Sequence, residues 1–211
     1  MLRKTYMPLM ASAALVLSAG AAQAAIVELA VNGDFEDGDL TGWTTFDNGG
    51  SITVTTGGNP GFKGFSNANG GPFNPVLKQA NVGAGLLTPG QTVDVSFDWM
   101  GTNSTGGVVE VVLFSELKLG GISQADFLLT GPAASATWQN VSQTIVIGPD
   151  VSGGVTLQLV AICGANAACV SEYMWDNVSI TANVVPVPAA VWLFGSALGL
   201  LGLVRRKLTS V

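Results

Sequence analysis

The chain has 211 residues, of which 48% are hydrophobic and 10% are charged, and its formal net charge is −6. It contains no histidine, which excludes a Ser-His-Asp triad and any zinc or iron site that depends on histidine ligands. Acid–base chemistry would therefore have to rest on carboxylates, lysine or tyrosine.

The first 24 residues have the pattern of a secretory signal peptide. Arg3 and Lys4 provide a positive start, an apolar stretch follows, and Ala22-Gln23-Ala24 forms an A-x-A cleavage site. We expect cleavage before Ala25 and export of residues 25–185. An uncleaved membrane anchor is the alternative interpretation.

Acidic residues crowd the segment NGDFEDGDLTGW, residues 32–43. It carries four carboxylates within six residues: Asp34, Glu36, Asp37 and Asp39. Clustered oxygen ligands suit a hard cation such as calcium, although the spacing is not that of an EF-hand. The alternative is a polar turn with a solvated acidic surface.

Short runs of alternating apolar and polar residues, typical of β-strands, follow in the middle of the chain. In the clearest run, residues 92–99, Val93, Val95, Phe97 and Trp99 share one face. Residues 108–115 are apolar on both faces and predict a buried central strand. Further strands are expected at residues 26–31, 51–56, 141–147, 155–162 and 173–181.

Two segments of this region do not fit a strand pattern. Residues 57–75 are expected to form a long loop, and residues 123–129 could be one helical turn or an irregular edge. About eight strands with glycine-rich turns and no fixed repeat predict an all-β fold, a β-sandwich or jelly roll over residues 25–183.

Some aromatic residues of this domain could stack against a sugar ring. Trp138 stands beside amide residues, and Phe62 and Phe65 lie in the expected long loop, so these three are the candidate ligand-binding residues. Trp99 is expected in the core. Exposed single aromatic residues are ordinary in proteins, so a purely structural role is the alternative.

The two cysteines, Cys163 and Cys169, both lie in the part that would be exported. Oxidising compartments favour disulfides, so we expect a local bond that closes a hairpin tip between two late strands.

Asp176 lies within the last expected strand. In strand phase it shares a face with Met174, Val178 and Ile180, which predicts an inward carboxylate. A buried charge needs a partner or a metal ion, because an unpaired one is very costly. The alternative is a bulge or a different register.

The opening N-G-x-F-E…G-W and the closing D-N-V-S resemble the galactose-binding-like jelly rolls, including carbohydrate-binding modules. The resemblance implies a structural calcium ion between the first and last strands. Glu36 and Asp176 would be its ligands, with Asp34 as a further candidate, and Phe35 and Trp43 would be core residues.

Outside the two terminal segments, three lysines stand against fourteen carboxylates, a formal charge of −11. Such a surface repels nucleic acid and anionic lipid, so we expect no nucleic-acid partner. It suits divalent cations or neutral ligands, and solubility alone is the alternative explanation.

The chain closes on an apolar, uncharged segment, residues 189–204, followed by Arg205, Arg206 and Lys207. Sixteen helical residues span about 24 Å, somewhat less than a bilayer core of about 30 Å. We expect a transmembrane helix whose basic tail stays in the cytoplasm. A buried core helix is the alternative.

This segment, with Pro186-Val187-Pro188 before it, resembles the PEP-CTERM sorting signal of Gram-negative bacteria. The resemblance covers residues 186–207, within an expected sorting segment of residues 184–211. It implies processing near the prolines by an exosortase, a membrane-embedded cysteine transpeptidase, and an association with exopolysaccharide. Val187 stands where the typical motif has glutamate.

The sequence therefore predicts an exported, non-catalytic surface or matrix protein that associates with extracellular polysaccharide. It would first be anchored in the inner membrane with its domain in the periplasm, and then reach the cell surface or the matrix. One alternative is a glycan-cleaving enzyme that uses carboxylates such as Asp98, Glu110 or Glu116. The other is a structural or adhesive protein without a defined ligand.

Overall fold

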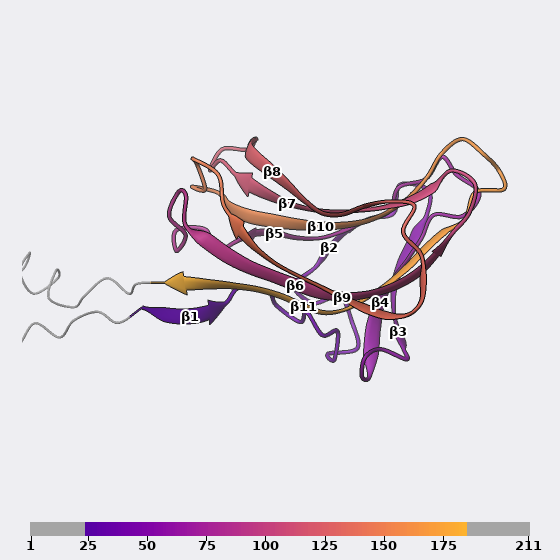
Figure 1. Cartoon of the computed structure of the whole chain (residues 1–211), viewed down its shortest axis with the longest axis horizontal. Coiled ribbons are helices and arrows are strands. Elements are labelled where there is room, and N and C mark those ends of the chain that lie inside the picture. Colours follow the sequence, from indigo (N-terminus) through magenta and orange to yellow (C-terminus); the bar gives the residue numbers. More distant parts are fainter. Residues whose placement is uncertain (1–23, 185–211) are drawn as a thin grey trace, which may run out of the picture. The chain divides into compact units, whose positions relative to one another are not determined.

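Eleven strands and no helix make up residues 24–184, the part of the chain that the computed structural model describes (Figure 1). In chain order the strands are β1 (Ala25–Glu28), β2 (Thr44–Phe46), β3 (Ser51–Thr56), β4 (Phe62–Asn67), β5 (Val76–Val82), β6 (Thr92–Asn103), β7 (Gly107–Glu116), β8 (Ile122–Gly131), β9 (Ser135–Val146), β10 (Gly154–Cys163) and β11 (Ser171–Val184). Within this part, no helix is long and apolar enough to cross a membrane. The predicted signal peptide and sorting segment lie outside the described residues, apart from Ala24 and Val184.

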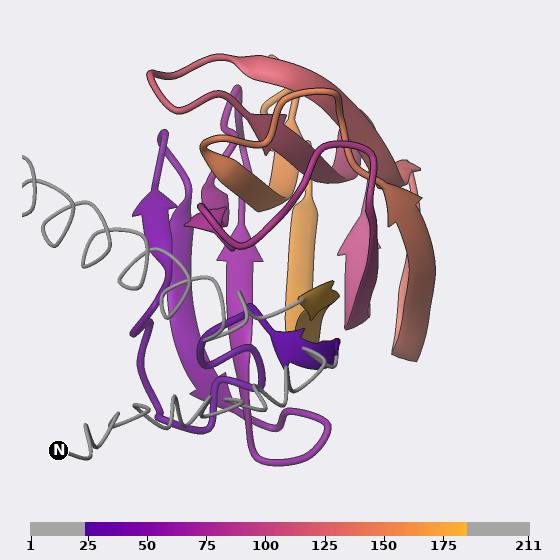
Figure 2. The same cartoon turned by 90° about the vertical axis from the view of Figure 1, so that its left-hand side faces the viewer.

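The strands form two antiparallel sheets that pack face to face as a β-sandwich (Figures 1 and 2). One sheet has the order β3-β4-β11-β6-β9, with β1 paired to the end of β11. The other has the order β2-β5-β10-β7-β8. The all-β prediction is confirmed, and the first and last strands lie side by side as expected.

The core forms where the inner faces of the two sheets meet. Val93, Val95, Phe97 and Trp99 of β6 are all buried, as the alternation predicted. Strand β7 lies between β10 and β8, which confirms the expected central strand at residues 108–115.

The expected core residues and the expected disulfide are also confirmed. Phe35 and Trp43 are buried and stack with ring centroids 5.1 Å apart. Cys163 and Cys169 form a disulfide, with their Cα atoms 5.8 Å apart. The loop that it closes is not a hairpin tip, because it links β10 and β11, which belong to different sheets.

The expectation of one long loop at residues 57–75 is wrong, because β4 lies within it and pairs with both β3 and β11. Its core-facing positions are Gly64 and Ser66, which stand opposite Trp175 and Tyr173. A Cβ atom at Gly64 would lie 2.8 Å from the Phe35 ring. The core demands small residues here, and these hide the strand's hydrophobic alternation. Residues 123–129, left undecided above, belong to the edge strand β8.

The predicted orientation of Asp176 is also wrong. Asp176 is in register with Asp98, but the next paired residue, Ser179, is in register with Ser96, so β11 carries one extra residue at a β-bulge. Asn177 in the bulge has a φ of 48°. Asp176 therefore lies on the outer face of the sheet, whereas Val178 and Ile180 beyond the bulge are buried in the core.

Candidate functional site

Two carboxylates lie side by side on the outer face of the β3-β4-β11-β6-β9 sheet, which we call the covered face. Asp98 of β6 and Asp176 of β11 are register partners, and both are buried. The loop of residues 57–61 lies over them, because its Asn59 contacts both carboxylates.

Hydrogen bonds satisfy both of these carboxylates. Asp176 accepts hydrogen bonds from two backbone N–H groups, that of Asn59 and that of Asn177 at 2.7 Å. Asp98 accepts the side-chain amides of Asn140 at 2.8 Å, Asn177 at 2.9 Å and Asn59 at 3.0 Å. Burial raises the pKa of Asp176 above its usual value, although the two backbone N–H groups oppose the shift.

Glu36 holds the same loop from its other side. Its Oε1 atom accepts the backbone N–H of Phe62 at 2.8 Å, and its charge adds to the rise in the pKa of Asp176. Gly61 has a φ of 76°, and a Cβ atom there would lie 2.0 Å from the Glu36 carboxylate. At Gly58, a Cβ would lie 1.8 Å from the Phe62 carbonyl oxygen and 2.7 Å from the Asp176 carboxylate. The loop can pass between the carboxylates only because these residues are glycines.

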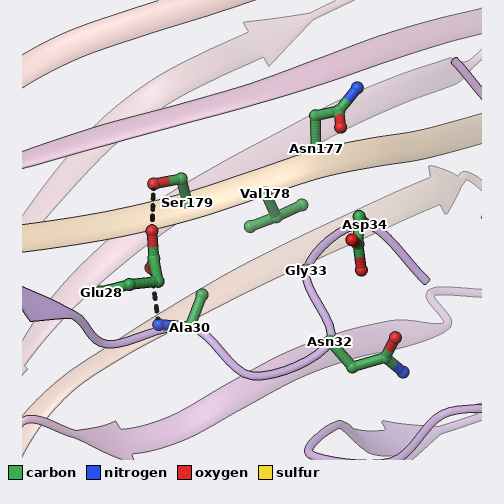
Figure 3. Close-up of a pocket in the computed structure, with 8 residues that line it drawn as sticks. All are labelled: Glu28, Ala30, Asn32, Gly33, Asp34, Asn177, Val178 and Ser179. Carbon is green, nitrogen blue, oxygen red and sulfur yellow. Dashed lines mark hydrogen bonds between the residues drawn. The ribbon is translucent and has the colours of Figure 1, made fainter. Parts of the chain in front are cut away.

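The structure brings two of the three predicted metal ligands, Glu36 and Asp176, to one loop. Asp34 accepts the backbone N–H of Glu36 at 3.4 Å and lines a pocket with Glu28, Asn32 and Ser179 (Figure 3). Glu28 in that pocket accepts hydrogen bonds from Ala30 and Ser179. Among the described residues, no three acidic or cysteine side chains converge in a way that could hold a metal ion.

The outer face of the β2-β5-β10-β7-β8 sheet, which we call the open face, is on the concave side of the bowed strands (Figure 1). Register places two rows of side chains across it. One row is Phe46, Val76, Val160, Glu110 and Thr130, and its neighbour is Thr44, Lys78, Gln158, Val112 and Phe127. Val112 and Val160 are buried and form an apolar floor.

Exposed aromatic rings stand at both edges of the open face. Phe46 on β2 is 47% exposed and Phe127 on β8 is 59% exposed. Four strand spacings separate them, roughly 19 Å. Between them lie Lys78, whose Nζ atom is 5.2 Å from the Phe46 ring centroid, Gln158 and Glu110.

The polar side chains of the open face lack hydrogen-bond and salt-bridge partners within residues 24–184. None of Lys78, Glu110 and Gln158 makes a side-chain hydrogen bond to a described residue, and the described part contains no salt bridge. Partly buried polar groups without partners, between exposed apolar rings, are typical of a ligand-binding surface.

The predicted ligand-binding residues lie on the other sheet. Phe62 packs against the core, and Phe65 and Trp138 are partly buried residues of β4 and β9. Register places Phe65 beside Met174 and Met174 beside Met100 on the covered face. Trp138 follows at the far edge, where β9 pairs with β6.

Phe46 and Phe127 are not among the ligand-binding residues predicted from the sequence. The three-residue strand β2 is too short to show a period, and Phe127 lies in the segment that had been left undecided. Neither residue stands next to the amides used as a criterion for stacking. The strand pairing of a complete sheet was needed to bring them onto one face.

The three candidate catalytic acids do not form a pair. Glu110 and Glu116 both project from the open face of β7, but six residues of a strand separate them by roughly 20 Å. A glycosidase pair is about 5–10 Å apart. Asp98 lies on the covered face, with both carboxylate oxygens occupied by amides.

Residues 27–160 match the family model of a carbohydrate binding domain. No curated protein matches the sequence.

The fold is similar to those of several solved structures. The CBM22-1–GH10 modules of Clostridium thermocellum endo-1,4-beta-D-xylanase 10B, complexed with xylohexaose, align at a TM-score of 0.53 and 14% identity, over 76% of this chain and 29% of that one. The enzymatically active domain of bacteriophage CBA120 tailspike protein 4 aligns at 0.57 and 13%, over 73% and 21%. The CBM22-1 xylan-binding domain of Paenibacillus barcinonensis Xyn10C aligns at 0.51 and 14%, over 80% and 99%.

This chain therefore spans less than a third of the first two structures and nearly all of the third. At these identities the likeness concerns the fold alone.

Proposed function

Because the chain belongs to the carbohydrate binding domain family, we propose that it binds a polysaccharide through the open face. The observation that carries the proposal is the pair of exposed rings, Phe46 and Phe127. Between them lie Lys78, Glu110 and Gln158, whose side chains make no hydrogen bond to a described residue. Flat rings stack against the C–H faces of sugars, and the polar groups can bond to hydroxyls.

The proposed ligand is a neutral polysaccharide. The charge of −11 outside the two terminal segments disfavours polyanions. Xylan is the first candidate, because two proteins of similar fold are described with xylan or xylohexaose.

Affinity electrophoresis against a panel of soluble polysaccharides tests this function. We expect retardation by at least one neutral glycan, and its loss in the double variant Phe46→Ala/Phe127→Ala. The matched variant is Phe65→Ala/Trp138→Ala, which removes two rings from the covered face. Loss of binding in the second variant alone would move the site to that face, and absence of binding to every glycan would favour the structural or adhesive alternative.

We also propose that calcium binds at Glu36 and Asp176. Both supply the carboxylate oxygens that calcium prefers, and both lie against the loop of residues 57–61. Burial raises the pKa of Asp176, and the nearby charges of Asp98 and Glu36 add to the rise; a divalent cation would stabilise the ionised carboxylate. Calcium would then hold the β1–β2 connection, which carries Glu36, against β11. Its role would be structural.

Calcium should raise the melting temperature of the wild type, because a ligand that binds only the native state stabilises it. Glu36→Gln should remove most of that rise. Asp34→Asn serves as the matched variant, because it removes a nearby charge while its Oδ1 atom can still accept the backbone N–H of Glu36, and it should respond to calcium like the wild type.

For the rest of the chain we propose export, insertion of residues 189–204 into the inner membrane, and sorting by an exosortase-like enzyme to the cell surface or matrix. The support is the Pro186-Val187-Pro188 motif, the apolar segment and the basic residues Arg205, Arg206 and Lys207. Deleting residues 186–211 should release the protein from membranes in a host that contains an exosortase. Unchanged fractionation would contradict the sorting proposal without affecting glycan binding.

We further propose that the domain is not catalytic, because no pair of the acids considered above is both accessible and suitably spaced. Turnover of a polysaccharide or chromogenic glycoside that Glu110→Gln abolished would overturn this proposal.

A further inference from the structure

Five aliphatic side chains are exposed at the end of the sandwich where the described chain begins and ends. They are Ile26 (75% exposed), Leu86 (50%), Leu119 (97%), Ile122 (54%) and Val146 (58%). They come from four separate places in the sequence, because Leu119 and Ile122 belong to the same hairpin. Exposed apolar side chains gathered in one region mark an interaction surface, whereas scattered ones need no explanation.

Strand register places these residues at one end, which we call the terminal end. On one sheet Ala25 pairs with Val184, and Thr92 pairs with Val146. On the other sheet Ile122 pairs with Glu116, beside the turn that carries Leu119.

The two sheets are joined at the terminal end. The side-chain amide of Gln124 donates to the carbonyl of Val146 at 2.8 Å, and the N–H of Gly148 donates to Ser115 at 2.9 Å. Figure 1 shows the β7–β8 turn, the β5–β6 connection and β1 at its left, and Figure 2 views this side.

The opposite end of the sandwich differs in character. It carries the disulfide-closed loop of residues 163–169 and the β6–β7 turn, where the exposed residues are glycine, alanine, serine, threonine and asparagine. None of the large exposed hydrophobic side chains of residues 24–184 lies there. The apolar surface is therefore a property of the terminal end.

In the sequence, only a short connection separates the terminal end from the predicted membrane helix. Four residues separate Val184 from Ala189, where the predicted membrane helix begins. Even fully extended, the chain from Val184 to Ala189 spans at most roughly 17 Å. If that helix is inserted, Val184, which lies at the terminal end, cannot be farther from the membrane than this reach.

We propose that the terminal end is a lipid-contacting surface, which rests on the bilayer through Leu119 and its four aliphatic neighbours while the chain is anchored. The inference depends on the anchoring proposed above. Residues 25–184 carry three lysines and fourteen carboxylates, so zwitterionic lipids should be favoured over anionic ones. The open face would then lie beside the bilayer and stay accessible to polysaccharide.

Site-directed fluorescence on the full chain in phosphatidylcholine nanodiscs tests this surface. The chain's two cysteines are bonded to each other, so Leu119→Cys introduces a single reactive thiol for an environment-sensitive dye. We expect its emission to shift to the blue and to be quenched by lipids that carry a spin label. Thr105→Cys, on the β6–β7 turn at the opposite end, is the matched position and should report water.

A second variant tests whether the other aliphatic residues take part. Adding Leu86→Ser and Ile122→Ser to Leu119→Cys should lower the quenching, and so should replacing half of the lipid with phosphatidylglycerol. A chain that stays in the nanodisc with the dye at residue 119 in water would overturn the inference and leave the anchor intact. Shielding that depends on protein concentration and persists in detergent would overturn it in favour of a second copy. A chain that fails to enter nanodiscs would contradict the anchor itself.

Discussion

The covered face and the open face belong to the same sandwich but differ in the hydrogen bonding of their polar groups. On the covered face, Asp98 and Asp176 are buried and bonded to the loop above them. On the open face, Lys78, Glu110 and Gln158 have no hydrogen-bond partners among the described residues and lie between exposed rings. A satisfied buried polar group stabilises a fold, whereas a group without a partner is available to a ligand. The two faces should therefore respond to mutation in different assays.

The largest expected effect is on stability, at Asp176. Replacing it with alanine leaves the N–H groups of Asn59 and Asn177 without their acceptor in a buried place. We expect the free energy of unfolding to fall by about 2–4 kcal/mol, measured by urea denaturation. Glu110→Ala on the open face should change it by no more than about 0.5 kcal/mol. Equal losses in the two variants would erase the distinction between the faces.

A somewhat smaller loss is expected at Gly61, which lets the loop pass Glu36. Gly61→Ala places a Cβ atom 2.0 Å from the Glu36 carboxylate at a residue whose φ is 76°. We expect a loss of about 1–3 kcal/mol in the free energy of unfolding. Gly85→Ala is the matched control, because Gly85 also has a positive φ but its Cβ would meet no atom within 4 Å. The difference between the two variants isolates the contact with Glu36 from the backbone strain.

Sequence reasoning captured the regular parts of both sheets. The alternation of Val93, Val95, Phe97 and Trp99 predicted β6 and its buried face, because side chains of a strand point alternately to its two sides. It failed at β4, where Gly64 faces the core because the Phe35 ring occupies the space of a side chain. Periodicity cannot show a residue chosen by a neighbour that is distant in the sequence.

The candidate site was predicted only in part, for a related reason. Short motifs near the two ends of the domain predicted that Glu36 and Asp176 lie together. In the structure both contact the segment of residues 57–62, from different elements. One extra residue at the bulge reversed the expected orientation of Asp176, and strand phase cannot reveal an insertion. Phe46 and Phe127 become one surface only when five strands are ordered into a sheet.

The polar groups of the open face should contribute to binding and not to stability. Gln158→Ala removes a side chain that makes no hydrogen bond to residues 24–184, and Lys78→Ala removes the cation over the Phe46 ring. We expect each to weaken binding of the best glycan about fivefold, or about 1 kcal/mol, in titration calorimetry. Their melting temperatures should match that of the wild type. Asn140→Ala on the covered face is the converse control, because its amide bonds Asp98: it should lower stability and leave affinity unchanged.

The smallest effect is the pH dependence that Asp176 gives to stability in the absence of calcium. Burial raises its pKa in the folded state above the usual value of 3.8. Between that value and the raised pKa, the folded chain holds a proton that the unfolded chain has released. Stability should therefore fall as the pH rises through this window, and stay lower above it.

The difference in free energy of unfolding between the wild type and Asp176→Asn isolates this titration, because the other carboxylates are common to both chains. We would measure both chains by urea denaturation in a chelator from pH 3.5 to 7. The free energy of unfolding of the wild type should fall relative to that of Asp176→Asn as the pH rises. Saturating calcium should reduce or reverse the shift, because a cation favours the ionised carboxylate. If this difference does not vary with pH, or if the wild type gains stability relative to Asp176→Asn as the pH rises in the chelator, then Asp176 is not held in a desolvated place. The covered face would then lose the property that most clearly separates it from the open face.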